Sequence, residues 1–437
     1  MENIKYHEYY RLKVAFLLVF LLLSINAIYN SLASGFGYQY PLNTFLFDPN
    51  DLFADYFKTT FSFINNKNEI HDFINLPELL RNYFLTNPYK SSIQALHNGE
   101  LTNLHGTPIS QLFALINVYF IKYVNPVYIF TFLNILFIYL AYLTLKKLVH
   151  SSYDRALMML IFISSYPFLF YFTRGHLYSI ALVILIANYL INIKNSKFIS
   201  ALFFLALAVN IRFNSAIFLA YIFFIESTIT LKIKNILIFT SLTIILFTGS
   251  LYVDELFYPL YSFSNFIEAV KNYHQLYVVG DAGFSFGSSP FGVLKYFYGF
   301  NKTIEIFPLL ASILLIAFIL MPKFISRFPE SSFIFLICAA FALSTPVFAD
   351  YYLSIFFIPL LFLYNSKKNN AKYNNNINFC IFISCILLIS PKNYYFFNMP
   401  SIQIFLNPMI LSISFLYTFF KNLGPINFQS PIKRKQL

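Results

Sequence analysis

The feature that most constrains this chain is a succession of long apolar runs, separated by short polar connections, along most of its length. A helix needs about 20 apolar residues to cross the roughly 30 Å hydrocarbon core of a bilayer, and these runs approach or reach that length. Helices also satisfy their own backbone hydrogen bonds in lipid, so helices are expected here. The runs lie at 12–33, 126–146, 156–173, 176–193, 198–211, 214–231, 235–252, 306–321, 331–349, 351–365, 376–390 and 402–420.

The composition excludes an ordinary soluble protein. Hydrophobic residues make up 58% of the 437 residues and charged residues 11%, whereas soluble domains carry roughly 25% charged residues. So few charges cannot cover a surface that faces water. We therefore predict an all-α, polytopic membrane protein with about 11–12 transmembrane helices, forming a single domain over residues 1–437.

The net charge of +12 has a regular distribution. Basic residues gather in the connections that follow every second run, as at Lys146–Lys147, Lys194–Lys197 and Lys232–Lys234. Loops rich in lysine and arginine stay on the cytoplasmic side of membranes. This pattern predicts a multi-pass membrane protein with both termini in the cytoplasm. Membrane lipids are then the expected partners of the excess charge, and nucleic acid is not.

The start of the chain has two interpretations. A basic segment, the apolar stretch Val14–Tyr29 and the small residues around Ser31-Leu32-Ala33 fit a cleavable signal peptide. The many later apolar runs favour a retained signal anchor instead.

Two hydrophilic segments, residues 34–125 and 253–305, are too long to be simple connections and are predicted as outer loops. The first includes PISQLFALINVYFIKYV (Pro108–Val124), whose apolar residues recur at helical spacing between polar ones. This pattern predicts a helix lying in the membrane interface. The second includes GDAGFSFGSSPFG (Gly280–Gly292), which lacks the strand–turn–helix context of a nucleotide-binding loop and is expected to lie near the membrane surface.

An acidic motif, FLFDPNDLFADYFK, follows the first apolar run. Asp51 and Asp55 are four residues apart, so on a helix they would project from one face. A carboxylate there could act as the base that deprotonates an acceptor hydroxyl. Asp48, before Pro49, better suits a helix start, where the helix dipole stabilises a carboxylate. No cofactor follows from the sequence, although Asp51 and Asp55 leave a divalent metal possible.

Four stretches carry a resemblance to a known family: FDPNDLFADYF, LHGTPISQLFALI (Leu104–Ile116), the segment Thr173–Phe224, which begins TRGHLYS and contains NIRFNS, and LSTPVFADYYLSIFFIPLLFLY (Leu343–Tyr364). In this order they resemble the GT-C superfamily of integral-membrane glycosyltransferases, and within it the glycosyltransferase family 87-like branch. The chain departs from the pattern of that branch at Thr107, where a proline is usual, at His105, where a tyrosine is usual, and at Asn214-Ser215, where a proline is usual.

The resemblance implies a GT-C-like fold and a hexosyl- or pentosyltransferase. Such an enzyme takes a sugar from a polyprenyl-phosphate donor and transfers it to a lipid-linked or envelope glycan acceptor on the outer face. A departing phosphate requires positive charge, and arginine matches phosphate oxygens with a planar fork of donors. The resulting candidates are Asp55 and Asp51 as catalytic carboxylates; Arg174, Arg212 and His176 as ligands of the donor phosphate; and Asp48, Asp350 and Tyr351 as second-tier site residues.

Other interpretations stay open. Arg174 and Arg212 could simply hold helix ends at the interface, and Asp350 could belong to an ordinary interfacial cluster with its neighbouring tyrosines. An O-antigen or capsular polysaccharide polymerase would share the many spans and long outer loops, and paired arginines in an outer loop would favour it. A polysaccharide flippase or solute transporter is a further alternative, for which repeated halves and polar mid-span residues would be expected.

Overall fold

The computed structural model describes a set of helices and the connections between most of them. The described residues are 107–121, 124, 126–225, 228–257, 262–279, 288–298, 328–368, 375–390 and 403–423, together with 17, 20, 21, 24, 55, 56, 313 and 315. These residues form helices and no β-sheet, in agreement with the predicted all-α class.

The first group of helices is α6 (Pro108–Ile121), α7 (Pro126–Leu148), α8 (Ser152–Ser164), α9 (Tyr166–Arg174), α10 (Leu177–Lys194) and α11 (Phe198–Ile211). A 3₁₀ helix, η2 (Phe213–Leu219), leads into α12 (Ala220–Ile225) and the long α13 (Ile229–Phe257). Next come α14 (Phe263–Tyr273), the π-helical η4 (His274–Val279) and α15 (Pro290–Tyr298). The last group is α18 (Glu330–Leu343), the 3₁₀ helix η6 (Asp350–Phe356), α19 (Phe357–Lys368), α20 (Asn375–Ile389) and α21 (Gln403–Leu423).

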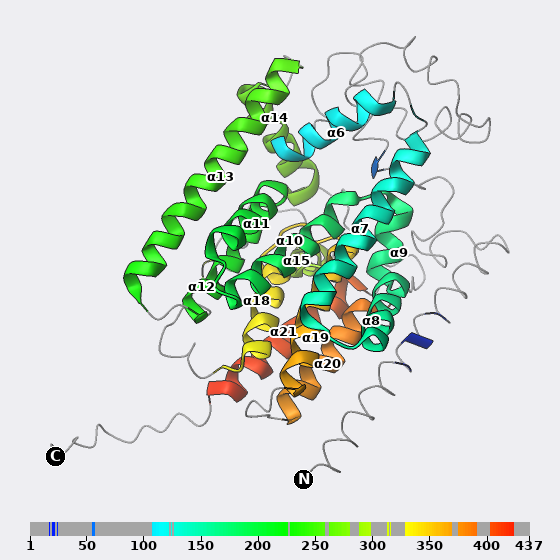
Figure 1. Cartoon of the computed structure of the whole chain (residues 1–437), viewed down its shortest axis with the longest axis vertical. Coiled ribbons are helices and arrows are strands. Elements are labelled where there is room, and N and C mark those ends of the chain that lie inside the picture. The colour runs from blue at the N-terminus through cyan, green and yellow to red at the C-terminus, as the bar shows by residue number, and fades with distance from the viewer. Residues whose placement is uncertain are drawn as a thin grey trace.

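The helices form a bundle with two distinct ends (Figure 1). Short connections make most consecutive helices antiparallel, so every second connection returns to the same end. We call one end the lysine end, because Lys147, Lys194 and Lys234 lie in the terminal turns of α7, α10 and α13 there. We call the opposite end the arginine end, because α9 ends there at Arg174 and α11 ends there beside Arg212.

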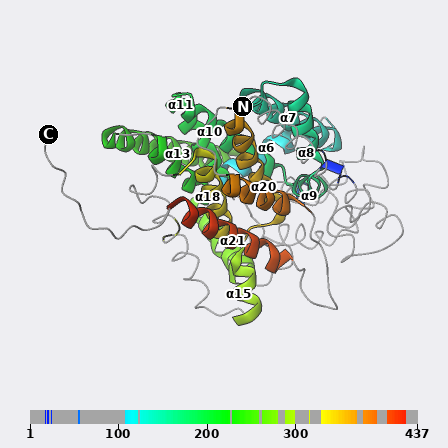
Figure 2. The ribbon, with the colours of Figure 1, turned by 90° about the horizontal axis from the view of Figure 1, so that it is seen from below.

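Helices α10 and α18 form the centre of the bundle, since nearly all their side chains are buried. Helices α7 and α13 instead expose large apolar side chains: Tyr128, Phe132, Ile135 and Tyr139 on α7, and Ile233, Leu237, Ile244 and Ile245 on α13. Figures 1 and 2 show α13 along one flank of the bundle. Apolar surface of this extent is costly in water and is suited to contact with lipid.

Within the part of the chain that the structure describes, three helices are long and apolar enough to cross a membrane: Tyr128–Leu148, Leu177–Lys194 and Ile229–Phe257. A fourth span results if α8 and α9, which are bent by 56° relative to each other, are taken together. The bend follows from Pro167, which has no N–H to donate to the preceding turn and whose ring clashes with it.

Most predicted runs coincide with helices, but the run at 214–231 extends past the end of α12 into α13, and the run at 235–252 covers only part of α13. The structure ends one helix at Ile225 and begins α13 at Ile229, so Lys232 and Lys234 lie inside α13 and not in a loop. Helix α13 also continues to Phe257, into the predicted second outer loop, whose described residues form α14, η4 and α15. The runs at 12–33 and 306–321 lie outside the described residues, apart from six positions.

The predicted interface helix at Pro108–Val124 forms as α6, which ends at Ile121. It lies across the arginine end of the bundle (Figure 1) and contacts α7, α11 and α13. Tyr178, at the start of α10, donates a hydrogen bond of 2.7 Å to the backbone oxygen of Ser110 and so ties α6 to the core.

Candidate functional site

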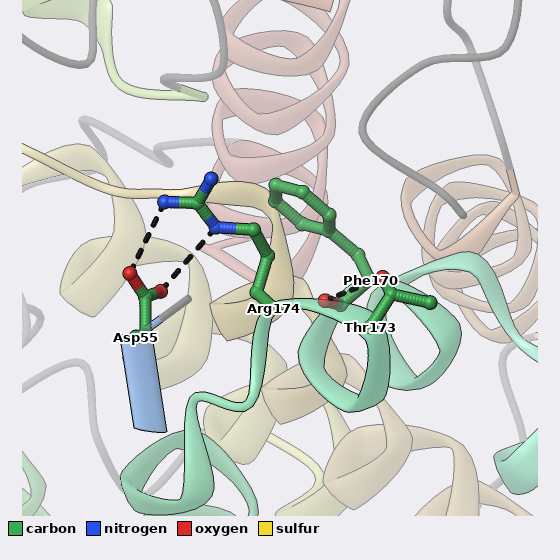
Figure 3. Close-up of polar contacts among 4 residues, drawn as sticks. All are labelled: Asp55, Phe170, Thr173 and Arg174. Carbon is green, nitrogen blue, oxygen red and sulfur yellow. Dashed lines mark hydrogen bonds and ion pairs between the residues drawn. The ribbon is translucent and has the colours of Figure 1, made fainter. Parts of the chain in front are cut away.

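An ion pair between Asp55 and Arg174 is the central feature of the arginine end (Figure 3). The Nη2 of Arg174 lies 3.1 Å from Oδ1 of Asp55, and its Nε lies 3.4 Å from Oδ2. The two residues are 119 positions apart in the chain. The arginine side chain is 10% exposed and the aspartate side chain 21% exposed, so the carboxylate is only partly shielded from solvent.

The end of α9 determines where Arg174 points. Gly175 caps the helix in the left-handed conformation, with φ of 75°; this suits glycine because it has no Cβ. The chain then turns directly into His176 and α10. The Thr173 hydroxyl donates a hydrogen bond to the backbone oxygen of Phe170 in the same helix. Arg174 instead extends away from the helix toward Asp55 (Figure 3).

Asp55 is held in place by its neighbour. Tyr56 is buried, and its ring packs 5.0 Å from that of Phe130 in α7. This contact ties the short helical segment that carries Asp55 to a helix of the bundle.

Arg212 lies on the other side of the site, where α11 ends and η2 begins. Its guanidinium is 3.9 Å from the centre of the Tyr352 ring, a cation–π contact. It also donates a hydrogen bond to the backbone oxygen of Val347. The neighbouring Asn214 donates to Thr345, which fixes this corner to the segment before η6.

His176 follows the Gly175 turn and packs against the tyrosines of η6. Its ring stacks on Tyr351 at 4.1 Å and contacts Tyr352 edge-on at 5.5 Å. Burial first, and then the charges of Arg212 and Arg174, together lower the pKa of His176 from 6.5 to about 3. His176 is therefore neutral at physiological pH and can contact a phosphate only through a neutral N–H.

Asp350 is fully buried and has partners from two other segments. Tyr166 donates to its Oδ2 at 3.1 Å, and Ser288 donates to its Oδ1. Asn407 in α21 donates in turn to Ser288 at 2.7 Å. Asp350 thus holds the start of η6, and with it Tyr351, against the rest of the site. Ser288 belongs to the glycine-rich segment Gly280–Gly292, so the described end of that segment packs against the site.

The structure brings four predicted residues together: Asp55, Arg174, His176 and Arg212, with Tyr351 stacked on the histidine. The predicted residues Asp48 and Asp51 lie outside the described part of the chain. In that described part, no group of three or more histidine, cysteine, aspartate or glutamate side chains is arranged to hold a metal ion.

Sequence reasoning missed two residues beside the site. Tyr178 lies 5.9 Å from the His176 ring and ties α6 to α10. Asp254 is fully buried in the last turn of α13. The available signal for Asp254 was an acidic pair, Asp254-Glu255, at the end of an apolar run, which also fits an ordinary loop start.

The arrangement combines a partly exposed carboxylate with two arginines whose charges both act on a neutral histidine. Arginines bind phosphate with paired hydrogen bonds, and a carboxylate beside them can accept a proton from a hydroxyl. The chain matches no family model, and neither a curated protein nor a solved structure is significantly similar to it.

Proposed function

We propose that this chain is an integral-membrane glycosyltransferase of the GT-C type in a bacterial inner membrane. It transfers a hexose or pentose from a polyprenyl-phosphate donor to a lipid-linked or envelope glycan on the outer face. One observation carries this proposal: the predicted base Asp55 forms an ion pair with the predicted phosphate ligand Arg174, and the nearby His176 contacts Tyr352, the ring that also holds Arg212.

The geometry supports a direct displacement. The donor phosphate competes with Asp55 for Arg174, and Arg212 supplies the second positive charge. Once Arg174 contacts phosphate, the Asp55 carboxylate accepts the proton of the acceptor hydroxyl. The acceptor oxygen forms a bond to the anomeric carbon while the bond from that carbon to the phosphate oxygen breaks. The phosphate leaves as an anion stabilised by both arginines, so no general acid is needed.

The position of the two arginines also favours a second candidate, the polysaccharide polymerase. Both arginines lie close enough to His176 to lower its pKa, and together they could bind the diphosphate of a polyprenyl-diphosphate-linked glycan. The two candidates differ in the donor that they bind, which is a monophosphate for the transferase and a diphosphate for the polymerase.

The test is thermal stabilisation of the detergent-purified protein by farnesyl phosphate, farnesyl diphosphate and farnesol. We expect farnesyl phosphate to raise the melting temperature and farnesol to have little effect. Arg174→Lys and Arg212→Lys should each weaken farnesyl phosphate binding by about tenfold or more, because lysine keeps the charge and loses the planar fork.

Arg155→Lys is the matched control, since Arg155 bonds to backbone oxygens of Val149 and His150 at the lysine end. It should bind farnesyl phosphate as wild type does. Stronger stabilisation by farnesyl diphosphate would favour the polymerase. Equal stabilisation by farnesol and farnesyl phosphate would contradict both candidates.

A further inference from the structure

Helix α14 (Phe263–Tyr273) carries an exposed apolar face that the mechanism above does not use. Phe263, Ile267 and Val270 follow one another at spacings of four and three residues, so their side chains lie on one face of the helix. The exposed fractions of these three residues are 55%, 38% and 44%. A contiguous group of exposed apolar side chains indicates a contact surface. We call this group the α14 apolar face.

The rest of α14 makes the helix amphipathic. Phe266 and Ala269 lie beside the α14 apolar face and are buried against the bundle. Glu268 and Lys271 lie on the remaining side of the helix and are exposed. A helix with a broad apolar side and a charged side is suited to the plane of a membrane interface, where its apolar side lies about 5–10 Å into the boundary between headgroups and acyl chains.

The contact of α14 with α13 shows how deep α14 lies. The ring of Phe266 is 5.4 Å from the ring of Phe247, and Figure 1 shows α14 beside the upper part of α13. Phe247 is 13 residues after Lys234, a distance of about 20 Å along a helix. With Lys234 at the cytoplasmic boundary, where basic residues stay, about 10 Å of the roughly 30 Å hydrocarbon core lies beyond Phe247. Phe266 therefore lies at the depth of the outer leaflet, although the sequence predicted an outer loop here.

Two observations favour lipid as the partner of the α14 apolar face. The surface of α13 near Phe247 is itself apolar and exposed, at Ile244 and Ile245, so α14 lies beside a flank that is suited to acyl chains. The charges of Glu268 and Lys271 cancel each other, so α14 offers no net charge to a charged partner.

We propose that α14 is a membrane-interface helix, whose apolar face lies among the acyl chains of the outer leaflet just below the headgroups. Helix α6 lies across the same end of the bundle and also contacts α13. The two helices together hold the arginine end at a fixed depth in the bilayer. This role is independent of the reaction at the candidate site.

The test uses the absence of tryptophan from the chain, because a single introduced tryptophan then reports its own surroundings. Full-length Ile267→Trp, Val270→Trp, Glu268→Trp and Ile244→Trp variants are reconstituted in phosphatidylcholine vesicles. The lipids are brominated near the headgroup, at mid-chain or near the methyl end of the acyl chain, and bromine quenches a tryptophan that it contacts. All four positions are exposed, so the new ring does not disturb the core.

We expect Ile267→Trp and Val270→Trp to be quenched most by bromine near the headgroup and to emit at shorter wavelength than Glu268→Trp. Glu268→Trp, on the charged side of the same helix, is the matched control and should be quenched weakly by every lipid. Ile244→Trp is the deep reference, since Ile244 is 10 residues after Lys234, about 15 Å along the helix and half of the hydrocarbon thickness. It should be quenched most by bromine near the methyl end.

Three results would overturn the inference. Emission and quenching of Ile267→Trp and Val270→Trp that match those of Glu268→Trp would place the α14 apolar face in water. Emission at short wavelength without quenching by any lipid would show that protein covers this face, and a change of that emission on dilution with lipid would identify a second copy of the chain. Absence of quenching in Ile244→Trp would show that the neighbouring flank of α13 does not face lipid.

Discussion

At the scale of single residues, His176 shows how packing sets the charge of the site. The ring contacts Tyr351 and Tyr352 of η6 and Tyr178 of α10. The charges of Arg174, at the end of α9, and of Arg212, just after α11, also act on it. Burial and two nearby cations favour the neutral ring. A charged histidine would add a third positive group, but a neutral one leaves Arg174 and Arg212 as the cations of the candidate site.

This charge state predicts a pH dependence of stability. The unfolded chain protonates His176 near its ordinary pKa of 6.5, whereas the folded chain keeps the ring neutral down to about pH 3. Between these values the unfolded state binds more protons, so stability is complete above about pH 6.5 and falls as the pH decreases. His176→Gln should flatten this slope between about pH 7 and pH 4.5 when melting temperature is measured in detergent.

The exposed His150 provides the control, and His150→Gln should leave the slope unchanged. A slope that is identical in wild type and His176→Gln would mean that His176 does not determine the acid sensitivity of the fold.

Residue chemistry and the family resemblance together named the candidate site residues, but they could not predict the contacts between them. Asp55 and Arg174 were predicted separately, as a base and as a phosphate ligand. Their ion pair depends on the packing of Tyr56 against Phe130 in α7. A local sequence pattern does not predict a contact between residues so far apart in the chain. Asp254 was missed because an acidic residue at the end of an apolar run has the same local pattern whether it is buried or solvated.

At the scale of helices, the backbone conformation of Gly175 determines where two candidate site residues lie. It ends α9 in a left-handed conformation and places Arg174 and His176 on either side of one residue. A second glycine, Gly249, lies inside α13, and a Cβ there would meet no atom within 4 Å. The two positions therefore make a matched pair for substitution by alanine.

Gly175→Ala should destabilise the fold by about 1–2 kcal/mol, because alanine pays a steric cost in the left-handed region. It should also weaken farnesyl phosphate binding by moving Arg174. Gly249→Ala should be neutral or stabilising by up to ~1 kcal/mol, since alanine is the better helix former. Melting temperatures and phosphate titrations of both variants check this. Equal effects of the two substitutions would show that the Gly175 turn is not required.

Apolar runs predicted most helices well because the polar residues that separate the runs lie close to the helix ends. The prediction failed around 226–257, where Lys232 and Lys234 were assigned to a loop. The structure includes these lysines in the first turns of α13, and their flexible side chains can reach away from an apolar helix end. Hydropathy alone therefore placed this boundary a few residues too late.

At the scale of the whole molecule, the two ends of the bundle differ in charge and in chemistry. The lysine end carries the ion pair of Lys194 with Glu330 at 2.5 Å, and the arginine end carries the candidate site. Helix α13, with 29 residues, connects the two ends. At about 1.5 Å per residue it is long enough to exceed the roughly 30 Å of bilayer hydrocarbon.

This arrangement predicts the topology in a membrane. Single cysteines at Lys147 and Lys234 should be labelled only from the cytoplasmic side, and cysteines at Asn75 and Glu255 only from the outer side, because basic loops stay inside. Membrane-impermeant maleimide on whole cells and on inverted vesicles measures this. Labelling of Lys234 and Glu255 from the same side would show that α13 does not cross. Labelling of Asn75 and Lys147 from the same side would mean that Pro108–Val124 spans the membrane.

The most direct measurement of the central claim is mass spectrometry of lipid-linked and envelope glycans from a strain in which the gene is deleted and then restored. We predict that deletion removes one type of sugar and accumulates the shorter acceptor, and that wild type and Glu255→Gln restore the product. Asp55→Asn should restore almost none of it at matched expression, because loss of a positioned base costs about 10²–10⁴ in rate. Glycans that are identical with and without the gene, or full restoration by Asp55→Asn, would contradict the account.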